Sequence, residues 1–180
     1  MPGTGEFNSP FGAEIIVISR VFSPLISIKP RRVGYLYYQG VSNVDYIIRE
    51  ELPSVETYRH IRVSAGLSDK TEQAAKTGLR NGLYSVVVCH QDAPVGMGRV
   101  IGDGGCFFVI TDIAVLPQHH KKGVGDRIMT ALMAWIARHA PPSAYISLIA
   151  SHGSPGFYAR YGFEPALLPE RAGMFLRIPG

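Results

Sequence analysis

A basic, glycine-bearing loop stands between a hydrophobic run, Val109–Val115, and an amphipathic stretch that is typical of a helix. The loop carries Lys121, Lys122, Gly123 and Gly125, and no Ser, Thr, Asp or Asn occupies the usual N-cap place. The first backbone N–H groups of a helix have no partner inside it, so another group must accept their hydrogen bonds. Glycines let the backbone approach a ligand closely, and a phosphate suits such a helix start. The loop therefore predicts an anion site.

Two common nucleotide-binding loops do not explain this anion site. The sequence contains no Gly-Lys-Ser or Gly-Lys-Thr, which excludes a Walker A loop. Gly96-Met-Gly98 lies inside a strand-like run and not at a turn from strand to helix, which argues against a dinucleotide-binding turn. Taken alone, the loop also fits a helix start that needs small residues, with its lysines facing solvent.

A second motif runs from Ser151 to Phe163. It predicts a short helix with Ser154 as its N-cap and Gly162 as its end. Successive residues of a helix are rotated by about 100°, so Tyr158 can face away from the buried side that Phe157 occupies. A tyrosine in that position is a candidate for chemistry.

Together, the two motifs resemble those of the GCN5-related N-acetyltransferase (GNAT) superfamily. The superfamily has Gln/Arg-x-x-Gly-x-Gly/Ala after a hydrophobic strand, and Phe-Tyr-x-x-x-Gly-Phe near the C-terminus. The second signature is met in full, and the first is met at both glycines, with His120 in the Gln/Arg position. The resemblance covers Val33 to Ile178. It implies an α/β (α+β) fold with a mixed, mostly antiparallel central sheet, helices on both faces, and splayed fourth and fifth strands.

The resemblance also implies acetyl-CoA as co-substrate and no metal. The pantetheine arm would pair with the backbone of Ile113, Ala114 and Val115, where one N–H would polarise the thioester carbonyl. The pyrophosphate would bind at the loop, mainly through backbone amides. The predicted cofactor residues outside the strand are His120, Lys121, Lys122, Gly123, Val124, Gly125, Asp126 and Ser151.

Tyr158 and Asp112 are the predicted catalytic residues. A phenol can protonate the departing thiolate, because the two groups have similar pKa values. Tyr158 can alternatively donate a hydrogen bond to the sulfur without transferring its proton, or serve only in packing. Asp112 would face the acceptor cleft as general base, although it can equally bind structural amides while a water chain carries the proton. Weaker candidates for the base are Glu50, Glu51 and His152.

The composition is that of a globular domain, with 46% hydrophobic and 18% charged residues. The net charge of +4 is dispersed, so we expect no nucleic-acid partner. The apolar stretch Ala13–Ile28 is too short to span a membrane and contains Arg20 and Pro24. Cys89 and Cys106 lack metal-site spacing and predict buried thiols in a reducing, cytoplasmic setting.

We expect residues 1–32 to be an N-terminal extension, part of it appended sequence, and residues 33–180 to be a single acetyltransferase domain. The predicted helix after the loop presents one apolar stripe formed by Ile128, Ala131, Leu132, Trp135 and Ile136. The other predicted helices begin at Ser54, Ser68 and Ser154. The predicted strands are 46–49, 83–90, 95–101, 106–115, 145–150 and 173–178.

The leading function is acetyl transfer to the primary amine of a small molecule. A protein acetyltransferase acting on lysine or an N-terminus, and a module that binds acyl-CoA without turnover, remain alternatives; a homodimer is left open. We expect a partly apolar acceptor, such as an arylalkylamine or an amino-acid-like compound. Strand residues alternate between faces, so one of Phe107 and Phe108 is expected to reach the acceptor opening.

Overall fold

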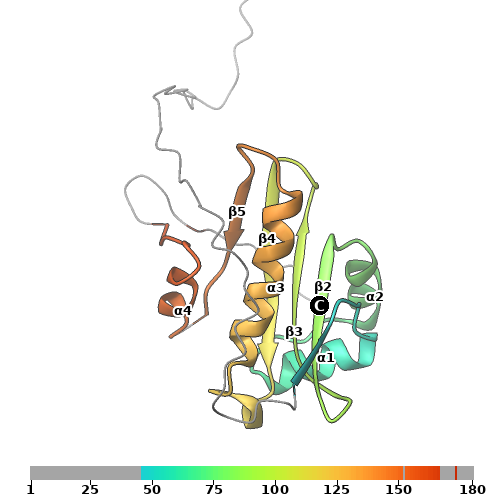
Figure 1. The fold of residues 1–180 in the computed structure, drawn as a ribbon. Coiled ribbons are helices and arrows are strands. Elements are labelled where there is room, and N and C mark those ends of the chain that lie inside the picture. Colours follow the sequence, from blue (N-terminus) through green and yellow to red (C-terminus); the bar gives the residue numbers. More distant parts are fainter. Residues whose placement is uncertain (1–45, 152, 167–172, 174–180) are drawn as a thin grey trace, which may run out of the picture. The chain divides into compact units, whose positions relative to one another are not determined.

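A computed structural model describes residues 46–151, 153–166 and 173 (Figure 1). Contacts divide the chain into two units, Met1–Val41 and Ser42–Gly180, and every described residue belongs to the second. The predicted extension and the predicted strand 173–178 lie outside the described residues, apart from Gly173. Among the described residues, no helix is long and apolar enough to cross a membrane.

The described strands form one mixed sheet in the order β1-β2-β3-β4-β5. Neighbouring strands are antiparallel except β4 and β5, which are parallel, so the predicted mixed, mostly antiparallel sheet is confirmed. The strands are β1 (Tyr46–Arg49), β2 (Tyr84–His90), β3 (Ala93–Gly102), β4 (Phe107–Val115) and β5 (Tyr145–Leu148).

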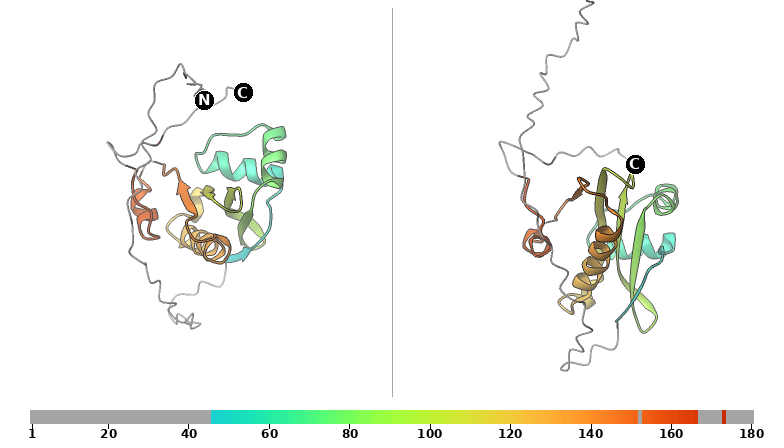
Figure 2. Two further views of the ribbon diagram at one scale, coloured as in Figure 1. Left: turned by 90° about the horizontal axis from the view of Figure 1, so that it is seen from above. Right: turned by 45° about the horizontal axis from the view of Figure 1, so that its top comes forward.

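Helices cover both faces of the sheet, as expected (Figure 2). The helices α1 (Val55–Ser64) and α2 (Glu72–Arg80) pack on one face, and α3 (Val124–His139) packs on the other. Ser54 caps α1 by accepting a hydrogen bond from the Thr57 amide. The predicted cap of α2 is wrong, because Thr71 and not Ser68 accepts from the first turn. The carbonyl of Ser68 instead accepts from Arg62, which holds this residue in the preceding loop.

The α3 helix confirms the predicted apolar stripe and the missing side-chain cap. Ile128, Leu132 and Ile136 are buried, and Ala131 and Trp135 are partly buried against the core. The N-cap is Gly123 at φ 77°, and no side chain caps the helix. Burial of this stripe against β2, β3 and β4 fixes the start of α3 beside the end of β4.

The two cysteines differ in exposure. Cys89 is buried in β2, as expected, and burial raises the pKa of its thiol. Cys106 is exposed, so the prediction of two buried thiols is wrong for this residue. It stands at the end of the β3–β4 hairpin, just before β4 enters the sheet, where the core does not cover it. Localisation in the cytoplasm stays a prediction.

Gly98 in β3 allows α3 to pack closely on the sheet. A Cβ at this position would lie 2.4 Å from Ile128 Cγ2 and 3.1 Å from Leu132 Cδ1. Both contacts are in the core beneath α3. The second glycine of Gly96-Met-Gly98 is therefore required for packing, in agreement with our rejection of this segment as a nucleotide loop.

We expect Gly98→Ala to lower the free energy of unfolding by about 1–3 kcal/mol, the usual cost of overpacking a core. Chemical denaturation measures it. Gly78→Ala is the matched control, because a Cβ in this α2 residue would meet nothing within 4 Å. Helix propensity should make that change stabilising by about 1 kcal/mol or less. Equal effects of the two changes would contradict the packing role of Gly98.

Candidate active site

The strands β4 and β5 stop pairing part-way along β4. Their parallel pairing ends at Ile110 and Leu148, whereas β4 continues to Val115. On this side, residues 111–115 have no strand partner among the described residues. The predicted splay of the fourth and fifth strands is thus observed, and it leaves an open strand edge next to the start of α3.

A bulge in β4 lies at the point of this opening. Met97 pairs with Ala114 and Arg99 with Thr111, so Asp112 and Ile113 together oppose Gly98. Asp112 has φ 56°, in the left-handed region where bulges usually place glycine. A bulge bends its strand and re-aims the residues that follow. The backbone at Ile113 therefore departs from the regular ladder where catalytic donors were predicted.

A cavity of about 540 Å³ lies between the end of β4, the start of α3 and α4 (Pro155–Ala159). Lys122 and Ser151 are the predicted cofactor residues that do not line it. The predicted residues that line it are Ile113, Ala114, Val115, His120, Lys121, Gly123, Val124, Gly125 and Asp126. The structure thus brings the two predicted halves of the cofactor site to one cavity.

The start of α3 supplies backbone donors to this cavity. The first helical hydrogen bond runs from the Arg127 amide to the Gly123 carbonyl, so the amides of Val124, Gly125 and Asp126 precede the helical ladder. The Asp126 carboxylate is engaged elsewhere, because Tyr161 Oη donates to it at 2.8 Å and Arg160 lies 2.9 Å away. Burial, together with the hydrogen bond to Asp126, raises the pKa of Tyr161 to about 12.

His120 contacts the open edge of β4. Its Nε2 lies 2.8 Å from the Val115 carbonyl oxygen. The Leu116 amide pairs with Val95 of β3, and residues alternate along a strand, so Val115 turns its backbone groups to the open edge. His120 thus hydrogen-bonds the Val115 carbonyl, one of the backbone groups that the resemblance assigned to the pantetheine arm. The sequence did not predict this contact.

A second cavity, of about 490 Å³, lies on the other side of the β4 bulge. Its lining includes Arg62, Ser68 and Lys70, and also Ser151, which we had predicted to bind the cofactor. Ile113 and Tyr158 line both this cavity and the cofactor-side cavity, so the two meet at these residues.

Tyr158 is half-buried on α4, in edge-to-face contact with Phe157. Burial raises the pKa of its hydroxyl above the ordinary 10.0, so the phenol stays protonated at neutral pH. Ser154 is the N-cap residue of α4, as predicted, but its side chain makes no cap bond, because Ser154 Oγ donates to the Ser151 carbonyl at 2.6 Å. Gly162, at φ 86°, follows the helix as predicted.

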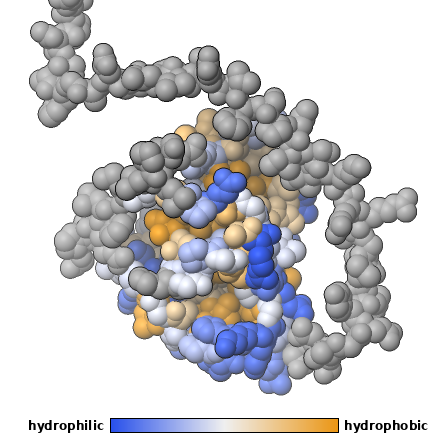
Figure 3. Space-filling view, turned by 90° about the vertical axis from the view of Figure 1, so that its left-hand side faces the viewer, coloured by the Kyte–Doolittle hydropathy of each residue, from blue (hydrophilic) through white to orange (hydrophobic). Residues whose placement is uncertain are grey.

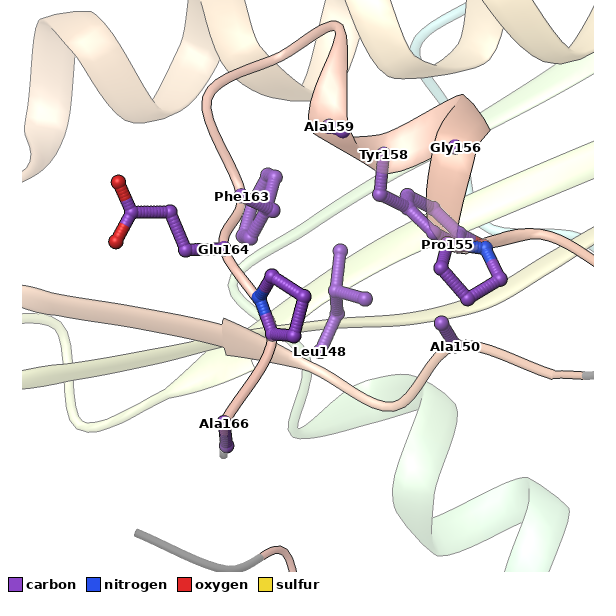
Figure 4. A pocket seen from close by; sticks show the side chains of 10 residues that line it. Leu148, Ala150, Pro155, Gly156, Tyr158, Ala159, Phe163, Glu164 and Ala166 are labelled. Atoms are coloured by element: carbon purple, nitrogen blue, oxygen red, sulfur yellow. The ribbon is translucent and has the colours of Figure 1, made fainter. Parts of the chain in front are cut away.

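A third cavity, of about 400 Å³ and largely apolar, lies under α4 (Figure 4). Leu148 and Ala150 form one wall, and Tyr158 and Ala159 face them from the helix. The face of the molecule that carries α4 and β5 shows hydrophobic residues among hydrophilic ones (Figure 3). Ile149, which directly follows β5, is 82% exposed. Tyr158 therefore borders three cavities.

Asp112 is held in a buried cluster. Its carboxylate accepts hydrogen bonds from Arg62 Nη1, from Arg99 Nε at 2.8 Å and from Tyr58 Oη at 3.2 Å. The side chain is 5% exposed, and those of both arginines are 8% exposed. Two guanidiniums and a phenol thus occupy the Asp112 carboxylate, and these contacts favour a positioning role over the predicted role as base.

The other candidates for the base and the acceptor wall lie elsewhere. Glu50 and Glu51 line neither of the two cavities that meet at Tyr158, and His152 is outside the described residues. Phe107 is 60% exposed and Phe108 is 1% exposed, which confirms their alternation. Neither lines those two cavities, so the expectation that one reaches the acceptor opening is wrong: Phe108 packs on Trp135 of α3, and Phe107 is near Tyr145.

Sequence reasoning missed the cluster around Asp112. Arg62 lies on the sheet-facing side of α1, and Arg99 lies in a strand whose other residues are mostly apolar and buried. A charged residue in a buried strand needs a partner, so Arg99 alone could have predicted a buried ion pair. Its partner was not readable, because 13 positions separate Arg99 from Asp112 and 50 separate Arg62 from Asp112.

Comparisons with known proteins agree with this geometry. Residues 81–165 match the acetyltransferase (GNAT) domain family. A protein of meticillin-resistant Staphylococcus aureus, described as of unknown function and a probable acetyltransferase, is 39% identical at a TM-score of 0.70, covering 74% of this chain and 99% of its own. No curated protein matches the chain.

More distant structures share the fold alone. A GNAT-family acetyltransferase from Streptococcus pneumoniae is 22% identical, with a TM-score of 0.62 and coverage of 75% of this chain and 99% of its own. The aminoglycoside N-acetyltransferase AAC(6')-Iy, solved in complex with CoA, is 19% identical, with a TM-score of 0.54 and coverage of 73% and 94%. This chain belongs to the GNAT family of N-acetyltransferases, because it is similar to the staphylococcal protein over 74% of its length, its strands β4 and β5 splay apart, and it carries both sequence signatures.

Proposed function

We propose that the protein transfers the acetyl group of acetyl-CoA directly to the primary amine of a small molecule. The observation that carries this proposal is that Ile113 and Tyr158 line both of the cavities that meet at the β4 bulge. The first cavity takes the cofactor, and the second takes the acceptor. The thioester would then lie at the junction, next to a backbone donor and a protonated phenol.

The cofactor-side cavity fits a pyrophosphate chemically. The unpaired amides at the start of α3 point to an anion site, and Lys121 lines the same cavity. Asp126 does not oppose this charge, since Arg160 and Tyr161 hold its carboxylate. The open edge of β4 supplies strand-like hydrogen bonds to an extended arm.

The chain's own groups account for each change of charge in the transfer. An amide of β4 near the bulge stabilises the oxyanion that forms as the amine attacks the thioester carbonyl. When the new C–N bond is complete and the C–S bond breaks, Tyr158 gives its proton to the departing thiolate. The amine's own proton leaves through water, because Asp112 is held by two arginines. Solvent then returns a proton to Tyr158.

Gly125→Val tests the cofactor site. A Cβ at Gly125 would lie 3.5 Å from Phe157 Cζ, an ordinary contact that leaves the fold intact. The branched side chain of valine would instead occupy the cavity where the pyrophosphate approaches. We expect acetyl-CoA binding to be abolished in titration calorimetry while the melting temperature changes little. Gly125→Ala is the control and should weaken binding less. Wild-type affinity in a folded Gly125→Val protein would refute the assignment.

Cofactor binding should take up a proton at His119, which lines the cofactor-side cavity. Burial, then the neighbouring His90 and Lys122, lower the pKa of His119 in the free protein. A bound pyrophosphate favours the charged imidazole and raises that pKa. The pKa of His119 is therefore higher in the complex than in the free protein. The affinity that the charged imidazole adds is fully present at pH values below the pKa of the free protein, and it is lost as the pH rises through the pKa of the complex.

Calorimetry near pH 6.5 in two buffers of different ionisation enthalpy measures this proton uptake. His119→Asn serves as the reference, because it leaves the titration of the cofactor's own phosphate unchanged. Equal uptake by the wild type and His119→Asn would exclude His119 as the source.

Turnover is tested by release of free CoA thiol in the presence of a panel of primary amines. Thiol release that depends on the amine supports acetyl transfer. Tight acetyl-CoA binding with no thiol release for any small amine would leave a binding module or a protein acetyltransferase, which an acetylated-peptide assay separates.

A further inference from the structure

The acceptor-side cavity, of about 490 Å³ beside Ile113 and Tyr158, has an excess of positive charge. Among the described residues that line it, the charged side chains are Arg62, Lys70 and Asp112. Arg99 also binds the Asp112 carboxylate, so two guanidiniums share one carboxylate. The cluster therefore carries one positive charge more than its carboxylate balances, and Lys70 adds another. The Asp69 carboxylate also interacts with Arg62, but it is paired with Arg59 at 2.7 Å.

The excess charge of the cluster is buried, so an opposite charge in the cavity would stabilise it. The side chains of Arg62 and Arg99 are each 8% exposed. Buried charges are costly unless an opposite charge pairs with them. The carbonyls of Ser68 and Gly78 accept hydrogen bonds from the two arginines, and the Tyr58 ring lies 5.4 Å from each guanidinium carbon. The carbonyl dipoles and the ring lower the positive potential but do not neutralise the charge.

The cavity also offers hydrogen-bond donors to an anion. Bonds to described residues use only part of the donor capacity of the Arg62 guanidinium, through Asp112 and Ser68. Ser68 and Ser151 also line this cavity, and both carry hydroxyls. A guanidinium with neighbouring hydroxyls is a chemically suitable site for a carboxylate.

The geometry points to an acceptor that carries a carboxylate on the same small molecule as its primary amine, as an amino acid does. This inference rests on the proposed function and specifies its substrate class. The amine would lie at Ile113 and Tyr158, and the carboxylate would lie toward Arg62 and Lys70. The same positive field disfavours the ammonium form of the amine, which helps it lose its proton to water without a carboxylate base. Polyamines and basic peptides would be repelled.

Matched acceptor pairs that differ only in the carboxylate test this inference. Phenylalanine is compared with phenethylamine, and tryptophan with tryptamine, by thiol release at saturating acetyl-CoA. One charge-assisted hydrogen bond is enough for about a tenfold preference, so kcat/KM should be at least about tenfold higher for the amino acid of the preferred pair. Equal or faster turnover of the decarboxylated amines in both pairs would overturn the inference.

Lys70→Glu gives a charge reversal at the cavity without touching the buried cluster. We expect the preference for the carboxylate-bearing acceptor to fall several-fold, with acetyl-CoA affinity unchanged. Lys76→Glu is the matched control, because Lys76 is exposed on α2 and lines neither cavity. The control should keep the wild-type preference. A preference that survives Lys70→Glu in full, or that falls equally in the control, would contradict selection by this cavity.

The outcomes separate this inference from the proposed function. If acetyl-CoA does not bind, or no small amine releases thiol, the proposed function fails. If acetyl-CoA binds and amines turn over but the carboxylate gives no advantage, the proposed function stands and the inference on substrate class fails.

Discussion

Tyr158→Phe should lower kcat by roughly 10²–10⁴-fold, the usual contribution of a positioned general acid. The change keeps the ring, its contact with Phe157 and its place between the cavities, and removes only the proton donor. Acetyl-CoA affinity should therefore be nearly unchanged, and KM should change little. Steady-state kinetics and titration calorimetry measure the two effects separately.

Tyr161→Phe is the matched control for this result. Tyr161 is three residues from Tyr158, and its hydroxyl donates to Asp126 and not to the junction of the cavities. We expect only a small change in kcat. The raised pKa of Tyr158 also predicts no loss of its proton below about pH 10, so wild-type kcat should show no alkaline fall from this group up to that pH. Full activity of Tyr158→Phe would remove the residue from the mechanism, and equal losses of binding and turnover would show a packing role.

Asp112→Asn should lower the free energy of unfolding by about 3–5 kcal/mol, the cost of leaving buried charges without their partner. The asparagine keeps the size of the side chain and tolerates the left-handed backbone of the bulge. It removes the one carboxylate that Arg62 and Arg99 share. Chemical denaturation measures the loss, and acetyl-CoA affinity should fall as well, because the cluster holds the bulge that aims the end of β4.

The same chemical change at Asp92 is the control. Asp92 pairs with Arg49 at the surface, where its side chain is 85% exposed, and an exposed pair contributes little. A general base would behave differently from a positioning residue. If Asp112→Asn kept full stability and cofactor affinity but lost kcat together with the acidic limb of the pH–rate profile, Asp112 would be the base after all.

The sequence predicted the elements well where periodicity and turn chemistry agree. The α3 stripe, the hairpin between β3 and β4 and the mixed sheet follow from local patterns. The start of α2 was misplaced because Ser68 and Thr71 are both good caps, and the pairing of Arg62 with the Ser68 carbonyl decides between them. Local sequence does not contain that contact.

The candidate site also has a part that local sequence predicts and a part that it does not. The loop before α3 and the motif of Tyr158 could be predicted, because backbone donors and a family signature identify them. The contacts of Asp112 could not be predicted, since alternation along β4 fails at the bulge and both of its arginine partners are remote in sequence. Ser151 follows the point at which β4 and β5 part, and it lines the acceptor-side cavity and not the cofactor-side cavity.

The Asp112 carboxylate, which Arg62 and Arg99 share, also constrains how this protein can evolve. Replacing Asp112 alone leaves two buried guanidiniums with no carboxylate between them, whereas replacing either arginine leaves a one-to-one ion pair. A lineage can therefore lose Asp112 only after it has lost or changed the arginines, because the reverse order would pass through a destabilised protein. We expect Asp112 to persist in every descendant that keeps both arginines.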